Sequence, residues 1–232
     1  MSKVIVLSSG GIDSTTCISL AIKDYGRENV MSASIYYGQK HSKELECARK
    51  IAEHYGIEHR EIDISKVGIF DNSQCTLLQN STKEISHESY SDQIENAENG
   101  MVDTYVPFRN GLMLSLMASL ALSEFPHETV YIYLGAHADD SAGSAYADCS
   151  PQFAFAMYEA INIGSYNQVH VCAPFINYTK KDVVSKGLEL DTPYELTWSC
   201  YEGGDKPCGT CGTCRDRAAA FAHNGVQDPA LQ

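Results

Sequence analysis

The sequence lacks any long apolar run, any export signal and any excess of basic residues. No stretch of about 18 residues is apolar enough to span a bilayer, and no basic region precedes an apolar one at the N-terminus, so we expect neither a membrane protein nor a secreted one. Lys and Arg total 17 against 30 Asp and Glu, a formal net charge of −13. Because proteins that hold tRNA present basic stripes to its phosphates, this balance favours a small-molecule substrate over nucleic acid.

Cysteine is present, but nothing in the sequence points to an oxidising compartment. The chain has 9 cysteines and no export signal, so we expect a cytoplasmic protein whose cysteines are thiols or metal ligands and not disulfides. A length of 232 residues suits one α/β domain with a small appendage.

The most informative segment lies near the start of the chain. Residues 4–7 form an apolar run typical of a buried strand, and a Ser-Gly-Gly-x-Asp-Ser turn follows before an apolar-periodic helix. Glycines allow the backbone to approach an anion closely, and a helix N-terminus offers unpaired N–H donors. The hydroxyls of Ser9, Ser14 and Thr15 add further donors. The segment therefore predicts a phosphate-binding turn at the carboxyl end of a strand.

Two common phosphate loops do not fit this turn. A Walker A loop requires a Lys after its last glycine, and no Lys follows Gly11. The spacing of the dinucleotide-binding fingerprint is also absent. The turn resembles the PP-loop signature of ATP pyrophosphatases, whose members cleave ATP between its α- and β-phosphates.

Strand and helix patterns alternate along the rest of the chain. Strands are expected at 31–37, 58–64, 130–134 and 169–172, and helices at 42–55, 109–122, after Pro151 and from Lys180. This order predicts a Rossmann-like parallel sheet with helices on both faces. Residues 66–104 lose periodicity, which is typical of a functional flap or a mobile segment.

The C-terminal region contains a closely spaced cysteine array. Its Cys-x7-Cys-x2-Cys-x2-Cys spacing allows the thiolates to point at one centre, as in a structural tetrahedral Zn²⁺ site formed by Cys200, Cys208, Cys211 and Cys214. An iron–sulfur cluster and a redox Cys-x-x-Cys pair are the alternatives. We expect a PP-loop ATP-binding ligase domain over residues 1–195 and a four-cysteine zinc-binding segment over 196–232, packed on it.

A PP-loop at the start and four cysteines near the end together resemble the QueC family of 7-cyano-7-deazaguanine (preQ0) synthases over nearly the whole chain. The matching segments are residues 9–18, 36–41 (Tyr-Tyr-Gly-Gln-Lys-His), 106–110 (Val-Pro-Phe-Arg-Asn), 135–139, 146–149 (Tyr-Ala-Asp-Cys), 179–180, 197–201 (Thr-Trp-Ser-Cys-Tyr) and 217–229.

The resemblance implies a ligase that uses ATP with Mg²⁺ to convert 7-carboxy-7-deazaguanine and ammonia to preQ0 in queuosine biosynthesis. Adenylation of the acid, amide formation and a second activation of the amide oxygen would lead to the nitrile. The resemblance also implies a homodimer. The chain has no room for a glutamine amidotransferase domain, so free ammonia or a partner protein must supply nitrogen.

Site residues follow from the same match. The catalytic candidates are Asp13, Arg109, Lys180 and Asp139, of which Arg109 and Lys180 would face the substrate carboxylate or the α-phosphate. ATP binding is expected at Ser8, Ser9, Gly10, Gly11, Ile12, Asp13, Ser14, Thr15, Thr16, Cys17 and Ile18.

Three further residues are candidates for binding the deazaguanine. Asp148 is able to accept hydrogen bonds from its N1–H and amine, although a helix-capping role suits it nearly as well. Tyr146 and Trp198 are candidates for stacking on the ring or, equally, for the core. His137 and His41 are left outside the predicted site, since a lone His is more often structural.

Two segments depart from the family pattern and keep other functions open. Phe108 replaces a Gly, and Ala147 and Ser150 replace a Pro and an Arg. A related ligase that stops at 7-amido-7-deazaguanine, or that joins the acid to another amine, is therefore the first alternative. A tRNA-thiolating enzyme and a non-enzymatic ATP-sensing module are the others.

Overall fold

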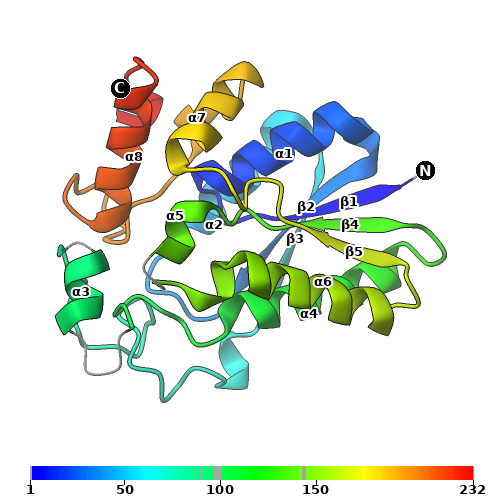
Figure 1. Cartoon of the computed structure of the whole chain (residues 1–232), viewed down its shortest axis with the longest axis horizontal. Helices are drawn as coiled ribbons and strands as arrows, with labels where there is room; N and C mark the ends of the chain where they lie inside the picture. Colours follow the sequence, from blue (N-terminus) through cyan, green and yellow to red (C-terminus); the bar gives the residue numbers. More distant parts are fainter. Residues whose placement is uncertain (1, 89, 97–100, 143–144, 232) are drawn as a thin grey trace.

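The computed structural model describes residues 2–88, 90–96, 101–142 and 145–231. A five-stranded sheet of order β3-β2-β1-β4-β5, with every neighbouring pair parallel, forms its centre (Figure 1). The strands are β1 (Lys3–Leu7), β2 (Val30–Tyr36), β3 (Glu58–Asp63), β4 (Val130–Tyr133) and β5 (Val169–Cys172). The helices are α1 (Ile12–Tyr25), α2 (Lys43–Tyr55), α3 (Tyr90–Asn96), α4 (Arg109–Glu124), α5 (Ala138–Ser141), α6 (Pro151–Gly164), α7 (Lys180–Glu189) and α8 (Gly212–His223).

Helices cover both faces of the sheet, as the alternating pattern predicted. On β1, Val4 and Val6 point into a core shared with α1, α2, α7 and α8, while Ile5 points into a core shared with α4 and α6. The apolar run of β1 is thus buried on both faces, which is typical of a central parallel strand. The strand order reverses at β1, and ligands of open α/β sheets bind at such a point.

Local sequence signals fix the ends of two helices that matter for the site. At the start of α7, the Thr179 hydroxyl accepts a hydrogen bond from the Asp182 N–H at 3.3 Å, and the Asp182 carboxylate accepts from the Thr179 N–H at 2.9 Å. This capping box places Lys180 at the first helical position. At the start of α6, the Ser150 hydroxyl accepts from the Phe153 N–H at 3.2 Å and Pro151 follows it.

The predicted irregular segment 66–104 contains only short regular elements where it is described. A 3-10 helix ends at Val67, α3 occupies Tyr90–Asn96, and residues 89 and 97–100 of the segment lie outside the described residues. Across the described part of the chain, no helix combines the length and the apolar character that crossing a membrane requires.

Candidate active site

A cavity of about 460 Å³ opens at the carboxyl ends of the central strands. Its walls include Ser8 after β1, Tyr37 after β2 and Gly135 after β4, together with Lys180 of α7 and Trp198. The segments that the sequence singled out at residues 8–14, 109–110 and 198–201 therefore meet at one place.

The turn that is predicted to bind phosphate forms one wall of this cavity. The Ser9 N–H donates to the Ser14 hydroxyl at 3.2 Å, and the Gly11 N–H donates to the Ser9 hydroxyl at 3.3 Å. The first N–H groups of α1 have no partner within the helix, so the turn presents donors and a positive dipole end to an anion. Of the residues predicted to bind ATP, those that line the cavity are Ser8, Ser9, Gly11, Ile12, Asp13 and Ser14.

The remaining predicted ATP-binding residues do not line the cavity. Thr15, Thr16, Cys17 and Ile18 are fully buried below the turn. The Thr15 hydroxyl donates to the Gly11 carbonyl at 2.7 Å, and the Thr16 hydroxyl lies 2.9 Å from the Tyr194 hydroxyl. Gly10 also lies outside the cavity wall, with a left-handed φ of 78°. These residues shape the turn from behind.

Lys180 and Asp13 form an ion pair at the cavity wall. The Lys180 Nζ donates to the Asp13 Oδ2 at 2.5 Å, and the His137 Nε2 lies 3.7 Å from the Asp13 Oδ1. Burial raises the pKa of the Asp13 carboxyl, but Lys180 and His137 together lower it further, so its net pKa lies below the usual value. Asp13 is therefore a carboxylate at neutral pH, and its Oδ1 is buried without a hydrogen-bond partner among the described residues.

The two acids of α5 hold neighbouring backbone groups. The Asp139 Oδ2 accepts from the Lys180 N–H at 2.7 Å, so this exposed carboxylate fixes the start of α7. The Asp140 Oδ2 accepts from the His137 N–H at 3.1 Å. Burial raises the pKa of Asp140 above its ordinary value. Both acids line the cavity next to Asp13.

Arg109 enters the cavity from the first position of α4. Its Nη1 donates to the Tyr37 hydroxyl at 2.9 Å, and its guanidinium carbon lies 5.7 Å from the centroid of that ring. The next residue, Asn110, donates its side-chain amide to the Asp148 carbonyl at 3.0 Å and to the Cys149 Sγ at 3.2 Å. Arg109 is thus held in place by groups other than a carboxylate, and its charge remains available to an anion.

The three residues predicted to bind the deazaguanine differ in position. Tyr146 lines the cavity, and its hydroxyl lies 2.6 Å from the Thr104 hydroxyl. Trp198 also lines it, with its ring under the Lys43 ammonium at 5.1 Å. Asp148 lies outside the cavity wall, where its Oδ2 accepts from the Asn110 N–H at 2.9 Å in the first turn of α4. A substrate-binding role for Asp148 stays a prediction, and the contact seen is the helix-capping one.

The four cysteines of the array lie together. One sulfur from each of Cys200, Cys208, Cys211 and Cys214 lies within 4.8 Å of the others. Tetrahedral Zn²⁺ with bonds of about 2.3 Å requires sulfurs about 3.8 Å apart, and the Cys208 and Cys214 sulfurs are 4.0 Å apart. The cluster is therefore able to hold a metal ion.

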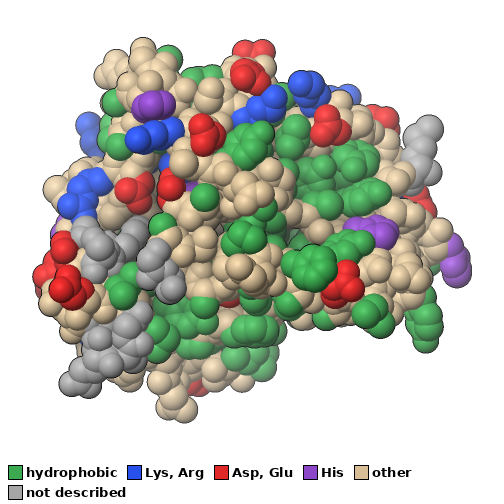
Figure 2. Space-filling model, in the orientation of Figure 1, with side chains coloured by type: hydrophobic (Ala, Val, Ile, Leu, Met, Phe, Trp, Pro, Cys, Tyr) green, Lys and Arg blue, Asp and Glu red, His purple; other side chains and the backbone are tan. Residues whose placement is uncertain are grey.

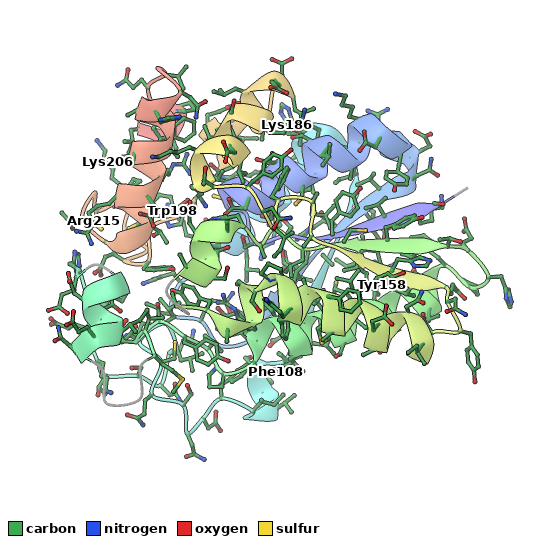
Figure 3. All side chains as sticks on the ribbon, viewed as in Figure 1. Phe108, Tyr158, Lys186, Trp198, Lys206 and Arg215 are labelled. Carbon is green, nitrogen blue, oxygen red and sulfur yellow. The ribbon has the colours of Figure 1, made fainter. Side chains whose placement is uncertain are left out.

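This cysteine cluster is connected to the phosphate-binding turn through Trp198. The Trp198 N–H donates to the Gly10 carbonyl at 2.9 Å, and its indole N–H donates to the Cys200 carbonyl at 2.8 Å. Figure 3 shows Trp198 beside α7 and α8. Farther along α8, the buried Arg217 is bonded to the carboxylate of Asp228 at 2.6 and 2.8 Å and to the Thr197 hydroxyl at 2.8 Å.

Sequence reasoning missed several residues of the cavity. His137 is buried against Asp13 and Asp140, although its sequence position directly after a strand end and Gly135 was a usable signal. Glu44 and Cys149 also line the cavity, and neither lies at a strand end that would have marked it. Leu77 and Thr104 enter the wall from the irregular segment 66–104.

Comparison with known proteins extends over almost the whole chain. The family model "Queuosine biosynthesis protein QueC" matches residues 3–225. A "7-cyano-7-deazaguanine synthase" of Archaeoglobus fulgidus is 42% identical over 99% of this chain and 90% of that protein. Proteins with the same name from Caldicellulosiruptor saccharolyticus and Pseudoalteromonas atlantica are 40% and 38% identical, covering 98% and 99% of this chain and 94% and 98% of their own. The cavity, the cysteine cluster and these matches agree, and the chain belongs to the QueC family of queuosine biosynthesis proteins.

Proposed function

We propose that this chain is an ATP-dependent carbon–nitrogen ligase that converts 7-carboxy-7-deazaguanine and ammonia to 7-cyano-7-deazaguanine through adenylated intermediates. The observation that carries the proposal is the single cavity in which the phosphate-binding turn faces Arg109 and Tyr146. The relatives that share this chain's length carry the name of that activity.

The chemistry explains why a phosphate site and a second anion site lie together. A carboxylate is a poor electrophile because its leaving group would be oxide, and attack on the α-phosphorus of ATP makes AMP the leaving group instead. Charge develops on the phosphates during this step, so fixed donors stabilise it most effectively. In our proposal the turn at residues 9–14 and Lys180 hold the phosphates, and Arg109 holds the substrate carboxylate.

The deazaguanine ring is proposed to lie near Tyr146 and Trp198, whose side chains line the same cavity. Tyr146 is held through Thr104 and Trp198 through Gly10 and Cys200, so both positions are fixed before substrate arrives. Asp148 would act by holding the start of α4, which carries Arg109.

Mg²⁺ is proposed to accompany ATP next to Asp13 and Asp139. Carboxylate oxygens suit this ion, and the Asp13 Oδ1 is a buried oxygen without a hydrogen-bond partner in the described structure. When bound, Mg²⁺ would neutralise phosphate charge.

The departures from the family pattern lie outside the cavity wall, which supports the nitrile as product. Phe108 has a left-handed backbone (φ 52°), the conformation that the expected Gly adopts easily, and its ring packs against Phe153 beside α4 (Figure 3). Ser150 caps α6, and neither it nor Ala147 lines the cavity. The amide-producing ligase remains the alternative outcome of the test.

Incubation with ATP, ammonium and 7-carboxy-7-deazaguanine, followed by mass spectrometry, tests the proposal. We expect the nitrile together with AMP and pyrophosphate, whereas amide alone would support the alternative. Asp13→Ala and Arg109→Ala should each lower substrate-dependent AMP release by about 10²-fold or more, because each removes a charge at the reacting groups. ADP and orthophosphate as the nucleotide products would contradict the proposal.

We further propose that the cysteine cluster holds structural Zn²⁺. Residues 196–232 are proposed to form a segment packed on a ligase domain of residues 1–195.

We also propose that the chain is a homodimer. Hydrophobic side chains gather on the face of the molecule shown in Figure 2, and on α6 the side chains of Phe155 and Ile163 are 66% and 71% exposed. Such a face suits a second copy. Light scattering should give the mass of two chains.

A further inference from the structure

One carboxyl group in the cavity has no role in the proposed chemistry so far. Glu44 lies in the first turn of α2 and lines the cavity together with Tyr37 and Arg109. Of the other acids in the wall, Asp13 and Asp139 accept hydrogen bonds from Lys180, and Asp140 accepts one from the His137 backbone. No described residue donates a hydrogen bond to the carboxyl of Glu44, and none forms an ion pair with it within 4.0 Å.

The fold fixes Glu44 beside the phosphate-binding turn. Gly10 packs directly on the first turns of α2, where a Cβ added to it would collide with the backbone oxygen of Glu44 and lie 2.9 Å from the Ala48 nitrogen. The side chain of Glu44 therefore starts next to the turn. Its electrostatic neighbour in the cavity is Arg109, whose positive charge acts on this carboxyl. Asp216, the remaining acid of the wall, has Lys180 and Asp139 as electrostatic neighbours.

Burial and the charge of Arg109 together set the pKa of the Glu44 carboxyl. Burial raises the pKa of Glu44 to about 7, and Arg109 counteracts part of this effect. The other titratable groups near it are Tyr37, Cys47, His41 and Lys43. Burial raises the pKa of both Tyr37 and Cys47, so these two stay protonated where Glu44 titrates.

The proposed reaction needs a base in this cavity. Nitrogen enters as ammonium and must lose every proton before a nitrile remains. Ammonium first gives a proton to a base, the lone pair attacks the acyl carbon, the bond to AMP breaks, and a second proton leaves to give the amide. The amide oxygen is then adenylated, and loss of AMP with the last two N–H protons gives the nitrile.

We propose that Glu44 is the general base that binds the incoming ammonium beside Arg109 and takes protons from nitrogen in both stages. This role rests on the proposed function. Protons accepted by the carboxylate pass to water between the stages, so the residue is regenerated. It lines the cavity next to the turn and close to Arg109, the residue proposed to hold the substrate carboxylate.

The test separates the two half-reactions. Exchange of labelled pyrophosphate into ATP, dependent on the carboxylate substrate and measured without ammonium, reports adenylation alone. Amide formation in a single turnover with ammonium, between about pH 6 and 9, reports the step assigned to Glu44. Wild type should show this rate rising with pH through an inflection near 7, since only the carboxylate form accepts a proton.

Glu44→Gln should keep the rate of pyrophosphate exchange within about threefold of wild type. Its rate of ammonium-dependent amide formation should fall about 10²-fold, and the inflection of that rate near pH 7 should disappear. Glu44→Asp should restore part of the rate. With hydroxylamine in place of ammonium, the rate of Glu44→Gln should fall less, because hydroxylamine is already unprotonated at neutral pH. Glu46→Gln, an exposed acid on the same helix, is the matched control, and His41→Asn should keep the inflection.

Two results would overturn the assignment. If Glu44→Gln formed amide at the wild-type rate and kept the pH inflection, Glu44 would have no part in the chemistry. If the variant lost pyrophosphate exchange and amide formation equally, Glu44 would be a structural residue. Failure of the proposed function is distinct from either, because wild type would then show no exchange that depends on the carboxylate substrate.

Discussion

At Asp13 two neighbouring groups keep a carboxylate charged in a place that otherwise disfavours charge. Only 20% of its side chain is exposed, and the Lys180 side chain that pairs with it is 16% exposed. Since burial opposes the charge, the lowered pKa depends on Lys180 first and on His137 second. The ion pair therefore positions the cation that is proposed to hold phosphate and the carboxylate that is proposed to hold Mg²⁺.

Lys180→Met should destabilise the protein by about 1–3 kcal/mol at pH 7, because it leaves Asp13 unpaired. The pKa of Asp13 is lower in the folded protein than in the unfolded chain, where it is near 4. The charged carboxyl therefore stabilises the fold at pH values above about 4, and this contribution disappears as the pH falls through the pKa of the folded state. The difference between wild type and variant in urea unfolding should therefore shrink on acidification. Lys186→Met, which breaks an exposed pair with Glu189 on the same helix, should change the free energy of unfolding much less. A difference independent of pH would contradict this account.

At the level of elements, the site depends on how closely α2 approaches the turn between β1 and α1. Gly10 has both a left-handed backbone and no room for a side chain, whereas Gly11 has neither a positive φ nor a contact closer than 3.3 Å at its Cβ position. The two adjacent glycines therefore have different functions, the first in packing and the second at the cavity.

Gly10→Ala should lower the free energy of unfolding by about 1–3 kcal/mol or more, since backbone strain adds to a clash with α2. Gly11→Ala should cost less than about 1 kcal/mol. Urea denaturation of both variants measures this difference. Equal losses would show that the packing of α2 on the turn is not what restricts position 10.

The main elements were predictable, whereas several cavity residues were not. Strand and helix periodicity located each strand to within about two residues, and the Ser-Gly-Gly-x-Asp-Ser turn and the cysteine spacing were visible as local patterns. Glu44 reaches the cavity because α2 packs beside the turn, a tertiary contact that no local pattern records, whereas His137 follows a strand end, a local signal that the prediction did not use. The four-residue helix α5 was missed because it is too short to show periodicity.

At the scale of the whole molecule, Trp198 connects the cysteine cluster to the turn that is proposed to hold ATP. Trp198, the only tryptophan in the sequence, bonds to Gly10 on one side and to Cys200 on the other. The state of the cluster should therefore influence the turn that is proposed to hold ATP.

Removal of the proposed Zn²⁺ by a chelator, or Cys208→Ser, should weaken the proposed ATP binding about fivefold, the equivalent of one hydrogen bond of about 1 kcal/mol. Calorimetry gives the affinity, and Trp198 fluorescence should shift in parallel. Metal analysis should find about one Zn²⁺ per chain in wild type and less in Cys208→Ser. Cys172→Ser, a half-buried cysteine outside the cluster, is the matched control. An unchanged affinity for ATP after loss of the metal would show that the cysteine cluster does not influence the turn.

The hydrogen bond between Trp198 and Gly10 joins segments from opposite ends of the sequence. During synthesis the glycine turn leaves the ribosome well before Trp198 and Arg217 do. The sheet is thus able to form before the proposed nucleotide pocket is complete. A nascent chain halted before α8 would carry the turn without its final wall, so nucleotide should protect the finished protein from proteolysis but not such an intermediate.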